Sequence, residues 1–216
     1  SGYGALYYNT TGHSNIAYGV CALFNNTTGV RNIAIGKKSL LANTTGCDNT
    51  ASGYKALTSN TEGKNNIATG REALQANTTG CHNVAIGNFA GCSNTTANNN
   101  TAVGTCSLFA NTTGASLVAV GYNALKSSTC ANCSTAVGHQ ALMDQTTGGG
   151  NTAVGQAAGE NITTGVANVI VGVKALCTAT VAHYNTAIGY QAQRQTTTGH
   201  CNSALGYNSL LSNTTG

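Results

Sequence analysis

A strict 17-residue repeat constrains this chain more than any other feature. Glycine recurs at every seventeenth residue, without an insertion or a deletion, and the thirteen positions are Gly2, Gly19, Gly36, Gly53, Gly70, Gly87, Gly104, Gly121, Gly138, Gly155, Gly172, Gly189 and Gly206. We number the repeat from this glycine, as positions 0 to 16, and its consensus is N-[TIV]-A-[VI]-G-x-x-A-L-x-x-N-T-T-G-x-x. A fixed period of this kind indicates stacked repeats that each contact only their neighbours.

The residues within one repeat favour β-structure over helices. Seventeen residues are too few for two helices and their loops, and Gly, Asn and Thr at fixed positions are poor helix formers. We therefore predict an all-β fold, a parallel β-solenoid (a β-roll or β-helix), with one 17-residue repeat per turn and about 13 turns. Residues 1–216 are expected to form a single repeat array that is part of a longer fibre or assembles into one.

Two extended segments are expected in each turn. N-T-A-V-G alternates with period two and is rich in β-branched residues, and a second segment begins at A-L and runs into N-T-T-G. The charged residues at positions 1, 2, 11 and 12 indicate exposed corners. Stacked asparagines are expected to form an amide ladder; they include Asn32, Asn49, Asn66, Asn83 and Asn100.

The first of these segments is apolar on both faces. A strand of this kind needs cover on both sides. One face can fill the thin core of the turn, and the other needs another wall of the coil or another chain. Lateral self-association is therefore an open possibility.

Charge and hydropathy limit the classes of partner that this chain is expected to bind. Charged residues make up 6% of the chain, against about a quarter in ordinary soluble domains. No run of about 18 apolar residues predicts a membrane span, and no basic-then-apolar leader or lipidation signal is expected. The net charge of +4 comes from scattered Lys and Arg, which argues against nucleic acid as the main partner.

The repeat resembles a known family. N-T-A-V-G-x-x-A-L is similar to the repeats in the YadA-like heads of trimeric autotransporter adhesins, and to phage and giant-virus fibre repeats of the NTAIGYQAL and NTTG type. "NTAIGYQA" at residues 185–192 carries the likeness best. The resemblance implies a left-handed, parallel β-roll, often trimeric, at a cell or virion surface. The period differs, because the adhesin heads repeat at about 14 residues and the N-T-T-G segment adds length here.

Two polar patterns are candidates for modification. The acceptor pattern N-x-[ST] makes glycosylation candidates of Asn9, Asn26, Asn43, Asn77, Asn94, Asn99, Asn111, Asn132, Asn161 and Asn213. The alternative is turn chemistry without sugar. Position 8 is threonine in every repeat, and this Thr column is a second candidate for glycans or a structural ladder; it comprises Thr10, Thr27, Thr44, Thr61, Thr78, Thr95, Thr112, Thr129, Thr146, Thr163, Thr180, Thr197 and Thr214.

The cysteine and acidic residues give little indication of disulfides, a metal site or catalysis. Nine cysteines leave at least one unpaired or bonded between chains, and only Cys130 and Cys133 are close enough in sequence for a local disulfide. No catalytic residue and no metal site is expected, because the five acidic residues fall in different turns and corners.

These observations predict a structural subunit of an extracellular fibre or filament. It is expected to self-associate laterally or end to end, to be open to covalent glycans, and to have no catalytic role and no cofactor. Its expected location is a cell surface, a matrix or a virion surface. The alternative is the shaft or head of an adhesin or viral tail fibre that binds a host receptor, and an ice-binding solenoid is a minor alternative.

Overall fold

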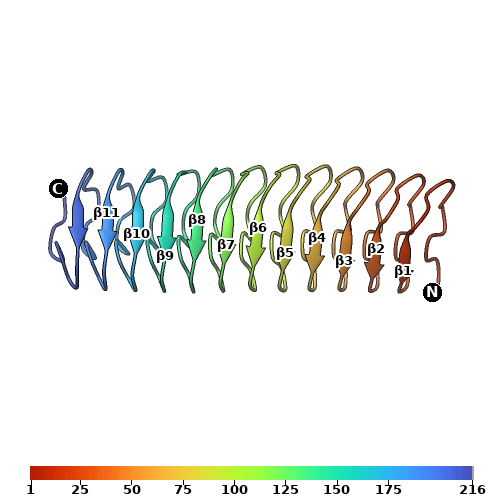
Figure 1. The fold of residues 1–216 in the computed structure, drawn as a ribbon, viewed down its shortest axis with the longest axis horizontal. Coiled ribbons are helices and arrows are strands. Elements are labelled where there is room, and N and C mark those ends of the chain that lie inside the picture. The colour runs from red at the N-terminus through yellow and green to blue at the C-terminus, as the bar shows by residue number, and fades with distance from the viewer. Residues whose placement is uncertain (216) are drawn as a thin grey trace. The chain divides into compact units, whose positions relative to one another are not determined.

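The computed structural model describes residues 1–215 and consists of two compact units, Ser1–Thr113 and Gly114–Gly216. The first unit contains β1 (Ile16–Tyr18), β2 (Ile33–Ile35), β3 (Thr50–Ser52), β4 (Ile67–Thr69), β5 (Val84–Ile86) and β6 (Thr101–Val103). The second contains β7 (Val118–Val120), β8 (Thr135–Val137), β9 (Thr152–Val154), β10 (Val169–Val171), β11 (Thr186–Ile188) and β12 (Ser203–Leu205). Within each unit successive strands pair in parallel, one strand per turn (Figure 1). The predicted all-β parallel solenoid with a 17-residue repeat is confirmed.

Strand pairing follows the repeat without slippage. Ala34 pairs with Ala51, which in turn pairs with Ala68, and each partner lies 17 residues further on. The alanine at position 15 faces the core and is buried, whereas positions 14 and 16 face outward. Because side chains alternate between the two faces of a strand, each three-residue strand contributes one side chain to the core and two to an outer face.

The core is narrow and consists of stacked columns. Alanine at position 15, alanine or serine at position 3 and leucine at position 4 are fully buried in most turns. Leu57 and Leu125 show the pattern in the two units, with no solvent exposure. In the first unit two asparagine columns, at positions 7 and 13, complete the interior, whereas position 7 of the second unit holds other buried side chains such as Gln145 and Ile162. The core is therefore partly polar, and its stability depends on whether these amides find partners.

The predicted second extended segment is wrong. Residues from position 1 to position 6 form turns, and no strand follows A-L within residues 1–215. The reason is a left-handed backbone, with φ between 47° and 69°, at positions 2, 4 and 12 of the described turns. Leu57 at position 4 has φ of 50°, and Lys55 at position 2 has φ of 56°. Left-handed residues reverse the chain locally, so they make corners where a continuous strand was expected.

Leucine in this conformation is unusual and must be stabilised by its surroundings. The left-handed region costs a residue with a Cβ atom roughly 1–2 kcal/mol. Full burial of a leucine side chain contributes about 1.5–3 kcal/mol, so packing offsets the strain at position 4. The exposed corner at position 12 has no such compensation.

Replacing Ala167 with glycine should therefore stabilise the second unit. Ala167 lies at position 12, is exposed and has φ of 56°, so the substitution removes the clash of its Cβ atom and almost no packing. We expect a gain of about 0.5–1 kcal/mol, reduced slightly by the greater freedom of glycine in the unfolded chain. The midpoint of urea unfolding measures the change, and an unchanged or lower midpoint would contradict the assignment of strain.

Candidate functional site

Two hydrogen-bonded asparagine ladders occupy the interior of the first unit. At position 13, Asn66 Nδ2 donates to Asn49 Oδ1 (3.1 Å) and to the carbonyl oxygen of Gly80 (2.8 Å). At position 7, Asn60 Nδ2 donates to Asn43 Oδ1 (2.9 Å) and to the carbonyl oxygen of Gly63 (3.1 Å). The ladder predicted at position 13 is confirmed. The ladder at position 7 lies in residues that the sequence offered as glycan acceptors.

The ladders decide which glycosylation candidates are accessible. Five of them are buried members of the position-7 column, with side-chain nitrogens that donate inside the fold: Asn26, Asn43, Asn77, Asn94 and Asn111. A glycan on Nδ2 would remove these donors and would not fit the closed core. Five others reach the surface to some degree: Asn99 and Asn132 are exposed, and Asn9, Asn161 and Asn213 are half-buried.

The Thr column at position 8 is a structural ladder. Thr44 Oγ1 donates to the carbonyl oxygen of Thr61 in the next turn (3.1 Å). The backbone N–H groups of Thr44, Thr45 and Gly46 donate to the same oxygen. One carbonyl thus accepts the donors of a whole N-T-T-G corner. This use of the hydroxyl group gives a physical reason for threonine at position 8.

The outer face of the sheet in the first unit is uncharged and mostly apolar. In the first unit positions 14 and 16 present isoleucine, valine, threonine and serine, with Tyr18 at one end, and none of the twelve side chains from β1 to β6 carries a charge. Ile16, Ile35, Ile67 and Ile86 are each at least 43% exposed. β3 interrupts this surface with Thr50 and Ser52. Exposed apolar patches mark interaction sites in many proteins.

All nine cysteines are free thiols. Cys130 and Cys133, the predicted local pair, are both exposed and unbridged, and Cys201 is exposed as well. Burial raises the pKa of the Cys92 thiol, helped by the negative charge of Glu72. Burial also raises the pKa of Cys177. Reactivity should therefore differ among the cysteines, because the thiolate is the reactive form.

Alkylation at neutral pH should separate the cysteines into two classes. We expect Cys130, Cys133 and Cys201 to react with iodoacetamide at least roughly tenfold faster than Cys92 and Cys177, because the first three are exposed and burial raises the pKa of the other two thiols. Peptide mass spectrometry over a time course measures this. The denatured chain is the control, in which all sites should react alike, and equal rates in the folded protein would contradict the burial described here.

Ionic contacts lie at the corners. Arg31 Nε donates to Asp48 Oδ1 at 2.6 Å and Arg31 Nη2 donates to Asp48 Oδ2 at 2.8 Å. This hydrogen-bonded pair lowers the pKa of Asp48 and raises that of Arg31. Because both groups face solvent, the pair is expected to contribute little to stability.

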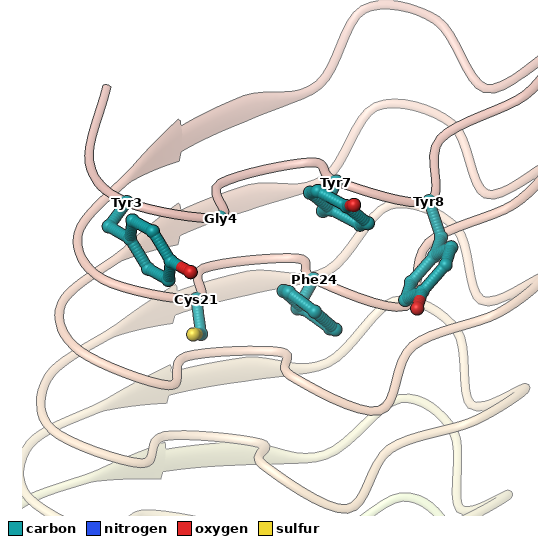
Figure 2. Close-up of a pocket in the computed structure, with 6 residues that line it drawn as sticks. All are labelled: Tyr3, Gly4, Tyr7, Tyr8, Cys21 and Phe24. Carbon is teal, nitrogen blue, oxygen red and sulfur yellow. The ribbon is translucent and has the colours of Figure 1, made fainter.

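An aromatic hollow lies on the flank of the first turns. Figure 2 shows the six residues that line it: Tyr3, Gly4, Tyr7, Tyr8, Cys21 and Phe24. Its volume is about 390 Å³. The rings of Tyr7 and Phe24 are stacked with centroids 5.3 Å apart, and Tyr8 meets both rings edge-on. Repeat positions 1, 2, 5 and 6 therefore share one flank of this unit.

Residues 1–215 contain neither a metal centre nor a membrane-spanning helix. No three His, Cys, Asp or Glu side chains lie together there as a metal centre would require. The same residues contain no helix long and apolar enough to span a membrane. No protein-family model, no curated protein and no solved structure matches this chain.

Proposed function

We propose that this protein is a structural subunit of an extracellular fibre that self-associates through the outer faces of its sheets. The observation that supports the proposal is the uncharged apolar face on β1 to β6, which has no partner within its own unit. The resemblance of the repeat to YadA-like heads and viral fibre repeats supports a role outside the cell. The function is mechanical and needs no catalytic residue or cofactor.

A second copy of this chain is the partner that such a face fits best. Successive strands lie about 4.8 Å apart, so large and small outward side chains recur at that spacing along the face. Another copy has the same spacing, and its ridges can enter the grooves over the whole length of the face. Because neither face is charged, the pair meets no repulsion between charged side chains, and burial of isoleucine and valine favours association.

The repeated hydrogen-bond columns support the mechanical part of the proposal. Each turn of the first unit is joined to the next by parallel strand pairing, by two asparagine ladders and by the Thr ladder. Separating two turns would break all of these at once. A stiff element built in this way suits a fibre.

Self-association is tested by placing charge on the outer face. Ile67→Lys combined with Ile86→Lys should shift the chain from assemblies to monomers in analytical ultracentrifugation, and should remove fibres from electron micrographs. The matched control is Thr79→Lys with Thr96→Lys, at exposed position 9, where another turn already carries Glu62. Urea unfolding checks that both variants fold. A monomeric native protein, or equal assembly of the two double variants, would overturn the proposed contact.

The alternative is a receptor-binding adhesin or viral fibre, in which glycans or corner side chains contact a host. Exposed Asn99 and Asn132 are the glycan sites most compatible with the fold. Intact-peptide mass spectrometry of protein from its native source distinguishes modified from bare residues. Sugar on the buried asparagines would contradict the ladder described above.

A further inference from the structure

Lysine and arginine gather on one corner of the first unit although they are dispersed in the sequence. Four of the nine basic residues of the chain lie at positions 1 and 2 of three successive turns: Lys37, Lys38, Lys55 and Arg71. Turns stack at about 4.8 Å, so equal positions form a column. We call these four residues, together with Tyr54, the cationic flank.

Most of this positive charge is not neutralised. Glu72 is the single acidic residue at positions 1 and 2 of any repeat, and its carboxylate accepts a hydrogen bond from Arg71 Nε at 3.4 Å. Lys37, Lys38 and Lys55 have no acidic partner in the described part of the chain. Lys37 is exposed, and Lys38 and Lys55 are half-buried. Three adjacent lysines without acidic partners create a local positive potential that attracts anions.

Aromatic rings hold the flank in an ordered arrangement. Lys55 Nζ lies 5.3 Å from the centre of the Tyr54 ring. The guanidinium carbon of Arg71 lies 5.9 Å from the same ring and 5.3 Å from the ring of Phe89. Cation–π contacts of this length restrict the side chains. Tyr54 itself remains 40% exposed, so part of its ring can meet a ligand.

The aromatic hollow extends this surface along the same flank. Its residues occupy positions 1, 2, 5 and 6 of the first two turns, and Lys37 and Lys38 occupy positions 1 and 2 of the turn that follows. Within the first unit the hollow and the cationic flank therefore form one strip. The first two turns of the strip present aromatic rings and tyrosine hydroxyls, and the following turns present positive charge.

We infer that this strip binds a linear acidic polysaccharide. Such a polymer carries carboxylates at regular intervals, which a column of cations can pair one after another, and its sugar rings present C–H faces to aromatic side chains and hydroxyls to tyrosine. A single-stranded nucleic acid fits less well. The chain has a pI of about 8.6, whereas domains that bind nucleic acid typically have a pI above about 9. The inference stands whether or not the chain forms a fibre.

Binding of alginate, a polyuronate, tests the inference. The full-length protein should bind fluorescent alginate oligosaccharides in low salt and release them as salt rises, because screening weakens exposed charge contacts. Lys37→Gln, Lys38→Gln and Lys55→Gln combined should weaken binding by at least roughly tenfold. The matched control replaces Lys64, at position 11, and Lys126 and Lys174, in the second unit, with glutamine. It removes the same net charge outside the strip and should change binding by less than about threefold. Tyr54→Ala should weaken binding too.

Three outcomes would overturn the inference. The first is no binding of alginate by the native protein. The second is an equal loss in the two triple variants, which would show attraction by net charge alone. The third is binding of an oligothymidine of equal charge as tightly as alginate, with the same loss in the first variant, because that would make the strip a general polyanion surface. Uncharged dextran should not bind, and unfolding midpoints confirm that each variant folds.

Discussion

Gly70→Ala is expected to prevent the first unit from folding. Gly70 has φ of 132°, a region that residues with a Cβ atom rarely enter. An added Cβ would lie 2.5 Å from the carbonyl oxygen of Gly87 and 2.6 Å from its carbon. Both atoms belong to the backbone of the next turn, so relief requires the turns to separate. We expect a loss of more than about 4 kcal/mol, seen as a collapsed urea midpoint and fast amide exchange in β4 and β5.

The control for this experiment is the same substitution at a corner. Gly150 lies at position 12, where other turns carry side chains, and a Cβ there would come no closer than 3.9 Å to Ala167. Gly150→Ala should therefore cost only about 1–2 kcal/mol, from the left-handed backbone alone. If both variants unfold equally, the close approach of turns at position 0 is not the reason for its glycine.

Asn66→Ala is expected to destabilise the first unit strongly. Its Nδ2 donates to Asn49 and Gly80, and its Oδ1 accepts from the backbone N–H (3.0 Å) and Nδ2 (3.2 Å) of Asn83. Alanine leaves a buried N–H and other amide groups without partners. Each unsatisfied group costs roughly 1–3 kcal/mol, so we expect a total of about 3–5 kcal/mol after partial relaxation.

The adjacent residue supplies the control. Asn65 is exposed at position 12, and its one described side-chain contact is with His82 at 3.4 Å. Asn65→Ala should change stability by less than about 1 kcal/mol. Urea unfolding gives both values, and hydrogen exchange of the Asn83 amide reports the ladder directly. Comparable losses in the two variants would show that the ladder contributes no more than a surface contact.

The sequence predicts the period and the strands because both depend on residue patterns that recur in every repeat. The alternation in N-T-A-V-G and glycine at a constant interval are enough to place Ala51 and Ala68 in one buried column. The corners at positions 2 and 12 were also expected from their charges. The amide ladder at position 13 followed from identical residues in stacked turns.

Other features depend on packing that one repeat does not reveal. Leucine disfavours the left-handed region, so nothing in A-L indicates a turn, and only its burial stabilises that conformation. Asparagine in N-T-T-G suits a glycan site and a ladder equally well, and burial decides between them. The cationic flank is invisible along the chain, because Lys38 and Lys55 become neighbours only after stacking. Alignment of the repeats at the 17-residue period places the asparagines of the ladder, and the basic residues of the cationic flank, at shared repeat positions.

The asparagine ladders also give each unit an electrical direction. In the first unit, from Asn26 and Asn32 onward, the ladder amides donate one Nδ2 hydrogen bond to Oδ1 of the preceding turn and accept through Oδ1 from the following one. These dipoles align head to tail, as peptide dipoles do in a helix. Two such units packed side by side in the same direction would have parallel dipoles that repel, whereas opposite directions attract. The amides in the core would thus favour antiparallel neighbours in a lateral assembly, although they never touch the neighbouring chain.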